Sequence, residues 1–72
     1  MSTVFDNNLT EQAIKALMDC PQCLKAIEQS PKCNIQEMFG AYLRVRKGII
    51  TPNLVDWKQV TKQVKSHVIQ EQ

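Results

Sequence analysis

The sequence predicts an all-α fold, with one small domain of about four short helices over residues 1–72. Apolar residues recur every three or four positions, which is the periodicity of helices rather than of strands. Prolines at positions 21, 31 and 52 and the glycine at position 48 divide the chain into four such segments. With 72 residues and a hydrophobic fraction of 43%, the chain can bury one small core and is too apolar for wholesale disorder.

The first helix is predicted over residues 9–19. Asn8, followed three residues later by Glu11, is typical of a capping box, and Phe5 precedes it as a hydrophobic staple. The apolar residues that then share one face are Leu9, Ala13, Ala16, Leu17 and Cys20, with Ile14 and Met18 at its edges. Residues 1–7 are expected to be flexible.

The second helix is predicted over residues 21–29. Pro21 suits the first helical position because the N–H that it lacks would be unpaired there, and Asp19 or Cys20 would be the cap. The helix ends before Pro31, since proline disfavours helical geometry in the residue ahead of it. The first two helices form a two-helix N-terminal unit.

The third helix follows Asn34, which forms a second capping box with Glu37, and it stops before Gly48. Its apolar arc consists of Ile35, Met38, Phe39, Tyr42, Leu43 and Val45. Gly40 lies inside the helix at a cost of about 1 kcal/mol relative to alanine. A close approach of another backbone would explain it.

The fourth helix begins either at Pro52, capped by Thr51, or after Asn53 as the cap. The alternative for residues 48–55 is a short extended piece. The apolar stripe of this helix consists of Leu54, Trp57, Val60, Val64 and Val68. The third and fourth helices are expected to pair as a longer C-terminal hairpin, with residues 70–72 flexible.

The net charge of +2 is unevenly distributed. Residues 1–40 carry three lysines and five acidic residues, which sum to −2, whereas residues 41–72 carry six basic and two acidic residues, which sum to +4. This asymmetry indicates a charged partner, and nucleic acid is the alternative that we consider. The basic residues that would bind it are Arg44, Arg46, Lys47, Lys58, Lys62 and Lys65. Lysines beside an apolar stripe are, however, typical of a solvated helix edge, and Arg44 and Arg46 point in nearly opposite directions.

The three cysteines are an odd number, and no secretory signal precedes them. We therefore expect a cytoplasmic chain with reduced thiols. Cys20, Cys23, Cys33 and His67 would make a Cys3His zinc set. The second tight ligand pair of such a site is missing, so buried thiols are the preferred interpretation and no metal is predicted. A redox Cys-x-x-Cys of the thioredoxin type needs a strand before its helix, where a helix is predicted here.

The function predicted from these features is non-enzymatic. The chain shows no legible catalytic triad and no glycine-rich phosphate loop, and no apolar stretch approaches the roughly 20 residues of a membrane span. Amphipathic helix faces instead favour an interaction module or regulator that binds another protein or a second copy of itself, with no cofactor. The interface candidates, chosen because their types are enriched at interface centres, are Met18, Met38, Tyr42 and Trp57.

Overall fold

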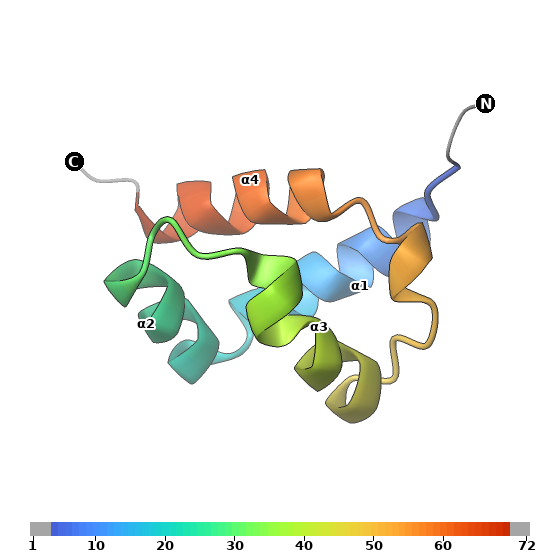
Figure 1. The fold of residues 1–72 in the computed structure, drawn as a ribbon, viewed down its shortest axis with the longest axis horizontal. Helices are drawn as coiled ribbons and strands as arrows, with labels where there is room; N and C mark the ends of the chain where they lie inside the picture. The colour runs from blue at the N-terminus through green and yellow to red at the C-terminus, as the bar shows by residue number, and fades with distance from the viewer. Residues whose placement is uncertain (1–3, 70–72) are drawn as a thin grey trace.

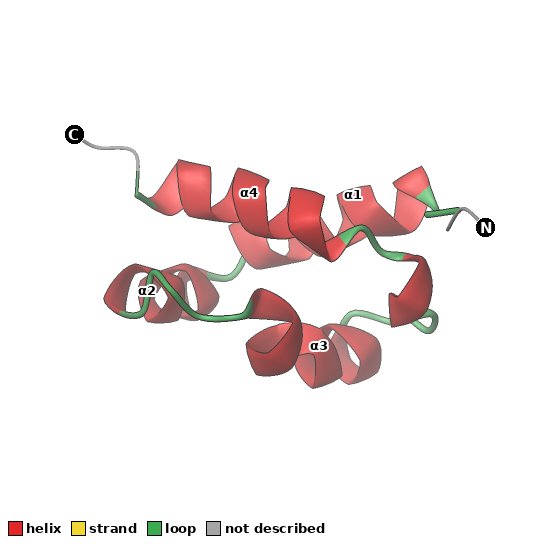
Figure 2. Ribbon diagram, turned by 45° about the horizontal axis from the view of Figure 1, so that its top comes forward, coloured by secondary structure: helices red, strands yellow, loops and turns green. Residues whose placement is uncertain are grey.

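The computed structural model describes residues 4–69, which form four α-helices and one short 3₁₀ helix (Figures 1 and 2). They are α1 (Asn7–Met18), α2 (Pro21–Gln29), α3 (Ile35–Arg46), η1 (Pro52–Leu54) and α4 (Trp57–Val68). No strand occurs within these residues. The all-α class and the number of α-helices are confirmed.

The helices form two layers, with α1 and α4 side by side in one layer and α2 and α3 in the other (Figure 2). The most extensive contact of α4 is with α1, and α3 packs against α4 over a smaller area. The pairing therefore differs from the expected α3–α4 hairpin. The reason lies in two hydrogen bonds that hold the start of α4 near α1: Asp6 N–H donates to the Leu54 carbonyl at 2.8 Å, and Asp56 N–H donates to Thr10 Oγ1 at 3.0 Å.

The core takes side chains from all four α-helices and from the connection before α4. Its buried apolar residues are Ala13, Leu17, Cys23, Ile27, Ile35, Phe39, Leu43, Ile49, Val55, Val60 and Val64. Ile49 and Val55 lie outside the predicted stripes, yet each is only 1% exposed. The connection thus closes one end of a core that the helices alone do not fill.

The helix caps follow the sequence in two places and depart from it in one. Asn34 Oδ1 accepts the Glu37 N–H at 3.2 Å, as predicted, and Cys20 is the one of the two predicted candidates that caps α2. The predicted Asn8 cap is wrong, because α1 begins earlier: Asp6 Oδ1 accepts the N–H groups of Asn8 and Leu9 at 2.9 and 3.2 Å. Residues 6–7, expected to be flexible, therefore belong to the helix start, whereas residues 1–3 and 70–72 lie outside the described part.

Both predicted starts of the fourth helix are wrong. Pro52 opens η1 instead, where Thr51 makes no side-chain cap bond, and Asp56 Oδ1 caps α4 by accepting the Gln59 N–H at 3.3 Å. The indole of Trp57 donates to the Pro52 carbonyl at 2.9 Å and holds η1 against α4 as a separate turn. Of residues 48–55, the alternative extended piece is excluded only for residues 52–54, which form η1; residues 48–51 belong to no helix or strand.

The two glycines have different roles. A Cβ on Gly40 would meet only Gln36 Cγ, at 4.0 Å, so no backbone approaches this position and the explanation offered above is wrong. Gly48 has φ +74° and ends α3 in the left-handed region, as its place after the helix predicted. No helix among residues 4–69 is long and apolar enough to cross a membrane.

Candidate functional site

Helix α3 has two apolar faces, one buried in the core and one largely exposed, on which only Tyr42 packs partly against the core. The buried face consists of Ile35, Phe39 and Leu43. The second face, which we call the α3 stripe, consists of Met38, Ala41, Tyr42 and Val45. Met38 is 44% exposed and Val45 is 76% exposed, while Tyr42 is half-buried. Residues three, four and seven apart lie on one side of a helix, so these side chains form a continuous apolar strip.

Cations border the α3 stripe. Successive helical residues are about 100° apart around the axis, which places the stripe between Arg44 on one edge and Arg46 on the other. Both arginines are exposed. Lys47 Nζ lies 5.9 Å from the centre of the Tyr42 ring, within range of a cation–π interaction. The strip is therefore apolar along its centre and positive at its C-terminal end.

The structure separates the four interface candidates. Met38 and Tyr42 lie together on the α3 stripe, whereas Met18 ends α1. Met18 and Tyr42 both pack partly against the core, and Met38 is exposed. Trp57 is half-buried at the start of α4, where its indole N–H is bound within the chain. Val45 and Met38 belong to the predicted apolar arc, yet both are exposed. An arc of six apolar residues is broader than one buried face needs, and that breadth is the signal by which the second face could have been found.

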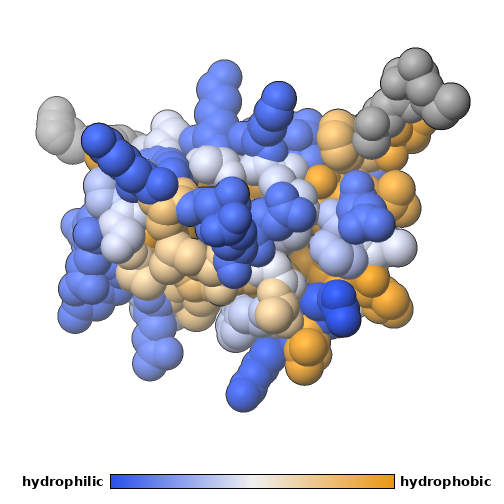
Figure 3. All heavy atoms as spheres, viewed as in Figure 1, coloured by the Kyte–Doolittle hydropathy of each residue, from blue (hydrophilic) through white to orange (hydrophobic). Residues whose placement is uncertain are grey.

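A second exposed apolar surface lies at the N-terminal end of the described chain. Val4, Phe5 and Leu54 line a shallow hollow of about 450 Å³ with Asp6 and Asn7. Figure 3 shows hydrophobic atoms gathered at this end and hydrophilic side chains along the outer side of α4. Leu54, predicted on the α4 stripe, is 38% exposed because it belongs to η1.

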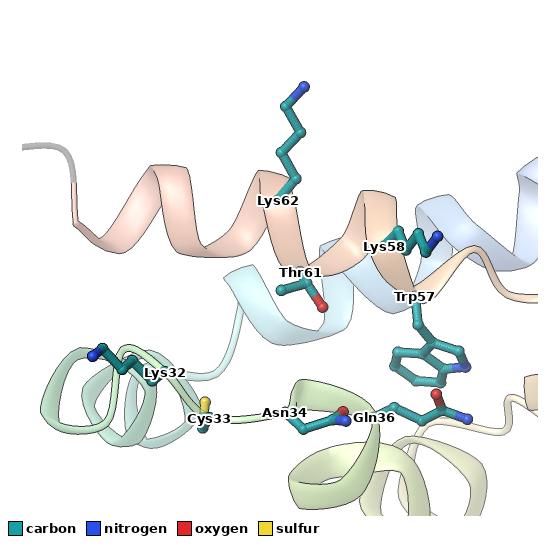
Figure 4. A pocket seen from close by; sticks show the side chains of 8 residues that line it. All are labelled: Lys32, Cys33, Asn34, Gln36, Trp57, Lys58, Thr61 and Lys62. Atoms are coloured by element: carbon teal, nitrogen blue, oxygen red, sulfur yellow. The ribbon is translucent and has the colours of Figure 1, made fainter.

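A polar groove of about 530 Å³ lies between α4 and the start of α3 (Figure 4). It is lined by Lys32, Cys33, Asn34, Gln36, Trp57, Lys58, Thr61 and Lys62. In Figure 4, Trp57 and Thr61 extend from α4 toward α3, whereas Lys62 points away from the groove. Lys32 was not among the candidates, because in the sequence it lies far from the basic half of the chain.

The six candidate cations do not form one cluster. Lys65 Nζ donates to the Cys33 carbonyl at 2.7 Å and so ties α4 to the connection between α2 and α3. Lys58 and Lys62 line the groove. Arg44, Arg46 and Lys47 lie at the C-terminal end of α3, which runs away from α4 in both ribbon views (Figures 1 and 2).

Cys20 and Cys23 lie at the N-terminus of α2, next to Tyr42. Cys20 Sγ accepts the Cys23 N–H at 3.3 Å. Hydrogen bonds from the Cys23 thiol and the Tyr42 hydroxyl to this sulfur lower the pKa of Cys20. Burial is the largest of the effects that raise the pKa of Cys23 to about 12. The hydrogen bond to Cys20 and the negative charge of Cys20 act in the same direction. Donating to Cys20 also raises the pKa of Tyr42.

The zinc set considered from the sequence is not assembled. Among residues 4–69, no three histidine, cysteine or acidic side chains come together in a way that could hold a metal ion. Cys33 lies in the groove beside α4, while Cys20 and Cys23 line a different hollow. All three cysteines are free.

The chain was compared with protein-family models, curated proteins and solved structures, and none of them gives a significant match.

Proposed function

We propose that this protein is a non-enzymatic interaction module whose α3 stripe binds an acidic amphipathic helix of another protein. The exposed strip formed by Met38, Tyr42 and Val45 carries the proposal. Its spacing over two helical turns is that of the anchors used when one helix packs along another. The free thiols are those of a chain that works in a reducing compartment, which for this proposal is the cytoplasm.

The flanking charges select the partner. Arg44 and Arg46 on opposite edges, with Lys47 beside Tyr42, favour a partner helix that places acidic residues next to its own apolar stripe. The interface residue types point the same way, since Tyr, Met and Arg are enriched at interface centres. A second copy of this chain would bring its own Arg44 and Arg46 toward the same cations, so an acidic partner fits better than a homodimer.

The test is site-specific photocrosslinking from the stripe. A photoreactive phenylalanine derivative replaces Ala41, which is exposed on the stripe, and the tagged chain is irradiated in cytoplasmic extract. The crosslinked peptide is identified by mass spectrometry. We expect an acidic, amphipathic helical segment, and we expect no such product from the same derivative at Lys25, which is exposed on α2.

Matched variants separate the stripe from apolar exposure in general. Met38→Glu with Val45→Glu adds two charges on the stripe, and Val4→Glu with Ile50→Glu adds two at side chains that are 77% and 80% exposed elsewhere. Loss of two anchors should weaken capture by at least about tenfold, or about 1.4 kcal/mol, in the first variant alone. Circular dichroism checks that both variants stay helical. Equal capture by both, or a crosslinked peptide that is basic or comes from a second copy of this chain, would overturn the proposal.

Nucleic acid is the second candidate partner, and the groove beside α4 is the observation that favours it. Lys32, Lys58 and Lys62 line this groove together with Trp57, and Lys58 lies beside Trp57 in Figure 4. A cation next to an aromatic ring suits a single-stranded backbone and its bases. Lys65 donates to the Cys33 carbonyl, and the cations of α3 lie elsewhere. This site therefore contains fewer basic residues than the sequence suggested.

A further inference from the structure

Cys20 and Cys23 form a close thiol pair at the first turn of α2. Cys20 is the N-cap and Cys23 follows three residues later, so both side chains lie on one side of the helix. The Cys23 N–H donates to Cys20 Sγ at 3.3 Å, and both cysteines line the same hollow. The two thiols therefore lie close together at the first turn of α2.

The two thiols differ in access. Cys20 is half-buried and Cys23 is 6% exposed. Both line a hollow of about 350 Å³ whose other walls are Gln22, Met38, Phe39 and Tyr42. A small reagent that enters this hollow from solvent therefore has better access to Cys20 than to Cys23.

The surroundings of the pair favour a thiolate on Cys20. The Cys23 thiol, the Cys23 N–H and the Tyr42 hydroxyl all donate to this sulfur and lower the pKa of Cys20. Positive partial charge at a helix N-terminus acts in the same direction. Two cations also act on the cluster, Lys47 on Cys23 and Arg46 on Tyr42.

We propose that Cys20 and Cys23 are a reversible oxidation site for hydrogen peroxide, with Cys20 as the attacking thiol and Cys23 as the resolving thiol. The sequence alone gave no ground for this, because the thioredoxin arrangement places a strand before the helix. Here the pair lies at the first turn of α2, which follows α1 directly. The proposal does not depend on the α3 stripe having a partner.

The chemistry proceeds in two balanced steps. The Cys20 thiolate attacks one oxygen of hydrogen peroxide, the O–O bond breaks, and the products are a sulfenic acid on Cys20 and hydroxide. The Cys23 sulfur then attacks the Cys20 sulfur, the S–O bond breaks, and the hydroxyl leaves as water with the Cys23 proton. The two thiols lose two electrons in total, which the peroxide accepts, and a dithiol reductant returns them by thiol–disulfide exchange.

Peptide mapping of the oxidised full-length chain tests the assignment. The reduced protein is treated with one equivalent of hydrogen peroxide, the remaining thiols are alkylated, and the peptides are identified by mass spectrometry. We expect a disulfide between Cys20 and Cys23, alkylated Cys33, and full reversal by dithiothreitol. A disulfide that includes Cys33, or a disulfide between two chains, would contradict the proposal.

Three variants separate the roles of the residues. Cys23→Ser should leave a sulfenic acid on Cys20 that dimedone traps, and Cys33→Ser should oxidise as the unaltered chain does. Tyr42→Phe removes one donor to Cys20. Each pKa unit that Cys20 gains should slow oxidation at neutral pH by roughly threefold, because higher nucleophilicity offsets part of an approximately tenfold loss of thiolate.

The rate of alkylation of Cys20, measured as a function of pH in the unaltered chain, gives a test that does not depend on how the variants fold. The pH midpoint of this rate should be lower in the native chain than in the urea-unfolded chain. Tyr42→Phe should raise the midpoint of the native chain. Equal midpoints in the two states, or peroxide oxidation that is no faster in the folded chain, would overturn the assignment.

Discussion

Single side chains that look available for a partner in the sequence are used inside this molecule. Trp57 was a candidate for an interface and Lys65 for a phosphate contact, yet each donates to a backbone carbonyl of its own chain. Thr10, which the sequence did not single out, also has a role within the fold. Its side chain is 2% exposed and accepts the Asp56 N–H at 3.0 Å. This hydrogen bond joins residues 46 positions apart. The Thr10 hydroxyl takes the place of the water that the N-terminus of a helix would otherwise bind.

The Thr10 contact gives a prediction at this scale. Thr10→Val keeps the shape but removes the acceptor of the part-buried Asp56 N–H, which should destabilise the fold by about 1 kcal/mol. Amide hydrogen exchange measured by NMR should show faster exchange at Asp56. Thr10→Ser keeps the hydroxyl and should retain protection there. Equal exchange at Asp56 in the two variants would mean that the bond contributes nothing to holding α4.

Helix α3 shows that an element can be amphipathic in more than one direction. Its buried face of Ile35, Phe39 and Leu43 would suffice to pack it, and the α3 stripe is a second face beside it. The two glycines of this region also have different roles. Gly48 serves the fold, because its φ of +74° lets the Ile49 N–H reach the Leu43 carbonyl at 3.2 Å. Gly40 has no such role, since nothing but the Gln36 side chain is within 4.0 Å of the Cβ it lacks.

The glycines therefore give opposite predictions for the same substitution. Gly40→Ala should stabilise the protein by about 0.5–1 kcal/mol, because alanine loses less entropy in a helix. Gly48→Ala should destabilise it by about 1 kcal/mol or more, because a Cβ disfavours positive φ. At roughly 4–8 °C per kcal/mol for a domain of this size, thermal unfolding resolves the two shifts. A fall in Tm for Gly40→Ala would indicate a close contact at α3 that the monomer does not have.

Across the whole molecule, the basic residues of the C-terminal half are divided between separate surfaces. The α3 stripe faces solvent at one side, with Arg44 and Arg46 at its edges, while Lys58 and Lys62 belong to α4. The formal charge of +4 on residues 41–72 is thus divided between two places, because α3 diverges from α4 (Figure 1). A ligand of limited size can meet one group of cations but not both.

The nucleic-acid alternative is tested at this scale. Trp57 is the single tryptophan and lines the groove, so its fluorescence reports binding of a single-stranded oligonucleotide. Lys58→Gln with Lys62→Gln should weaken binding and reduce the magnitude of the slope of log affinity against log salt by about 1 to 1.5. Lys15→Gln with Lys25→Gln removes equal charge from exposed positions on α1 and α2. Equal losses from both pairs, or no quenching at all, would argue against a groove site.

Local sequence determined most of the secondary structure. Helical spacing of apolar residues, Asn34 and Cys20 as caps and Gly48 as a stop were sufficient for α2 and α3, because each depends on neighbours within one turn. The same rules misplaced the starts of α1 and α4. Several residues there could act as N-caps. The residues that do so, Asp6 and Asp56, also donate backbone hydrogen bonds that link the start of α1 to the start of α4.

The sequence by itself determined that this chain is a small all-α domain with an uneven distribution of charge along the chain and three cysteines that it predicts to be reduced. Only the tertiary structure decided which apolar face of α3 is buried, that α4 pairs chiefly with α1, and that Cys20 and Cys23 meet Tyr42 while Cys33 does not. The physical reason is the distance along the chain over which each interaction acts. Periodicity and capping act within a few residues, whereas burial, the Thr10–Asp56 bond and the surroundings of the thiols depend on segments that folding alone brings together.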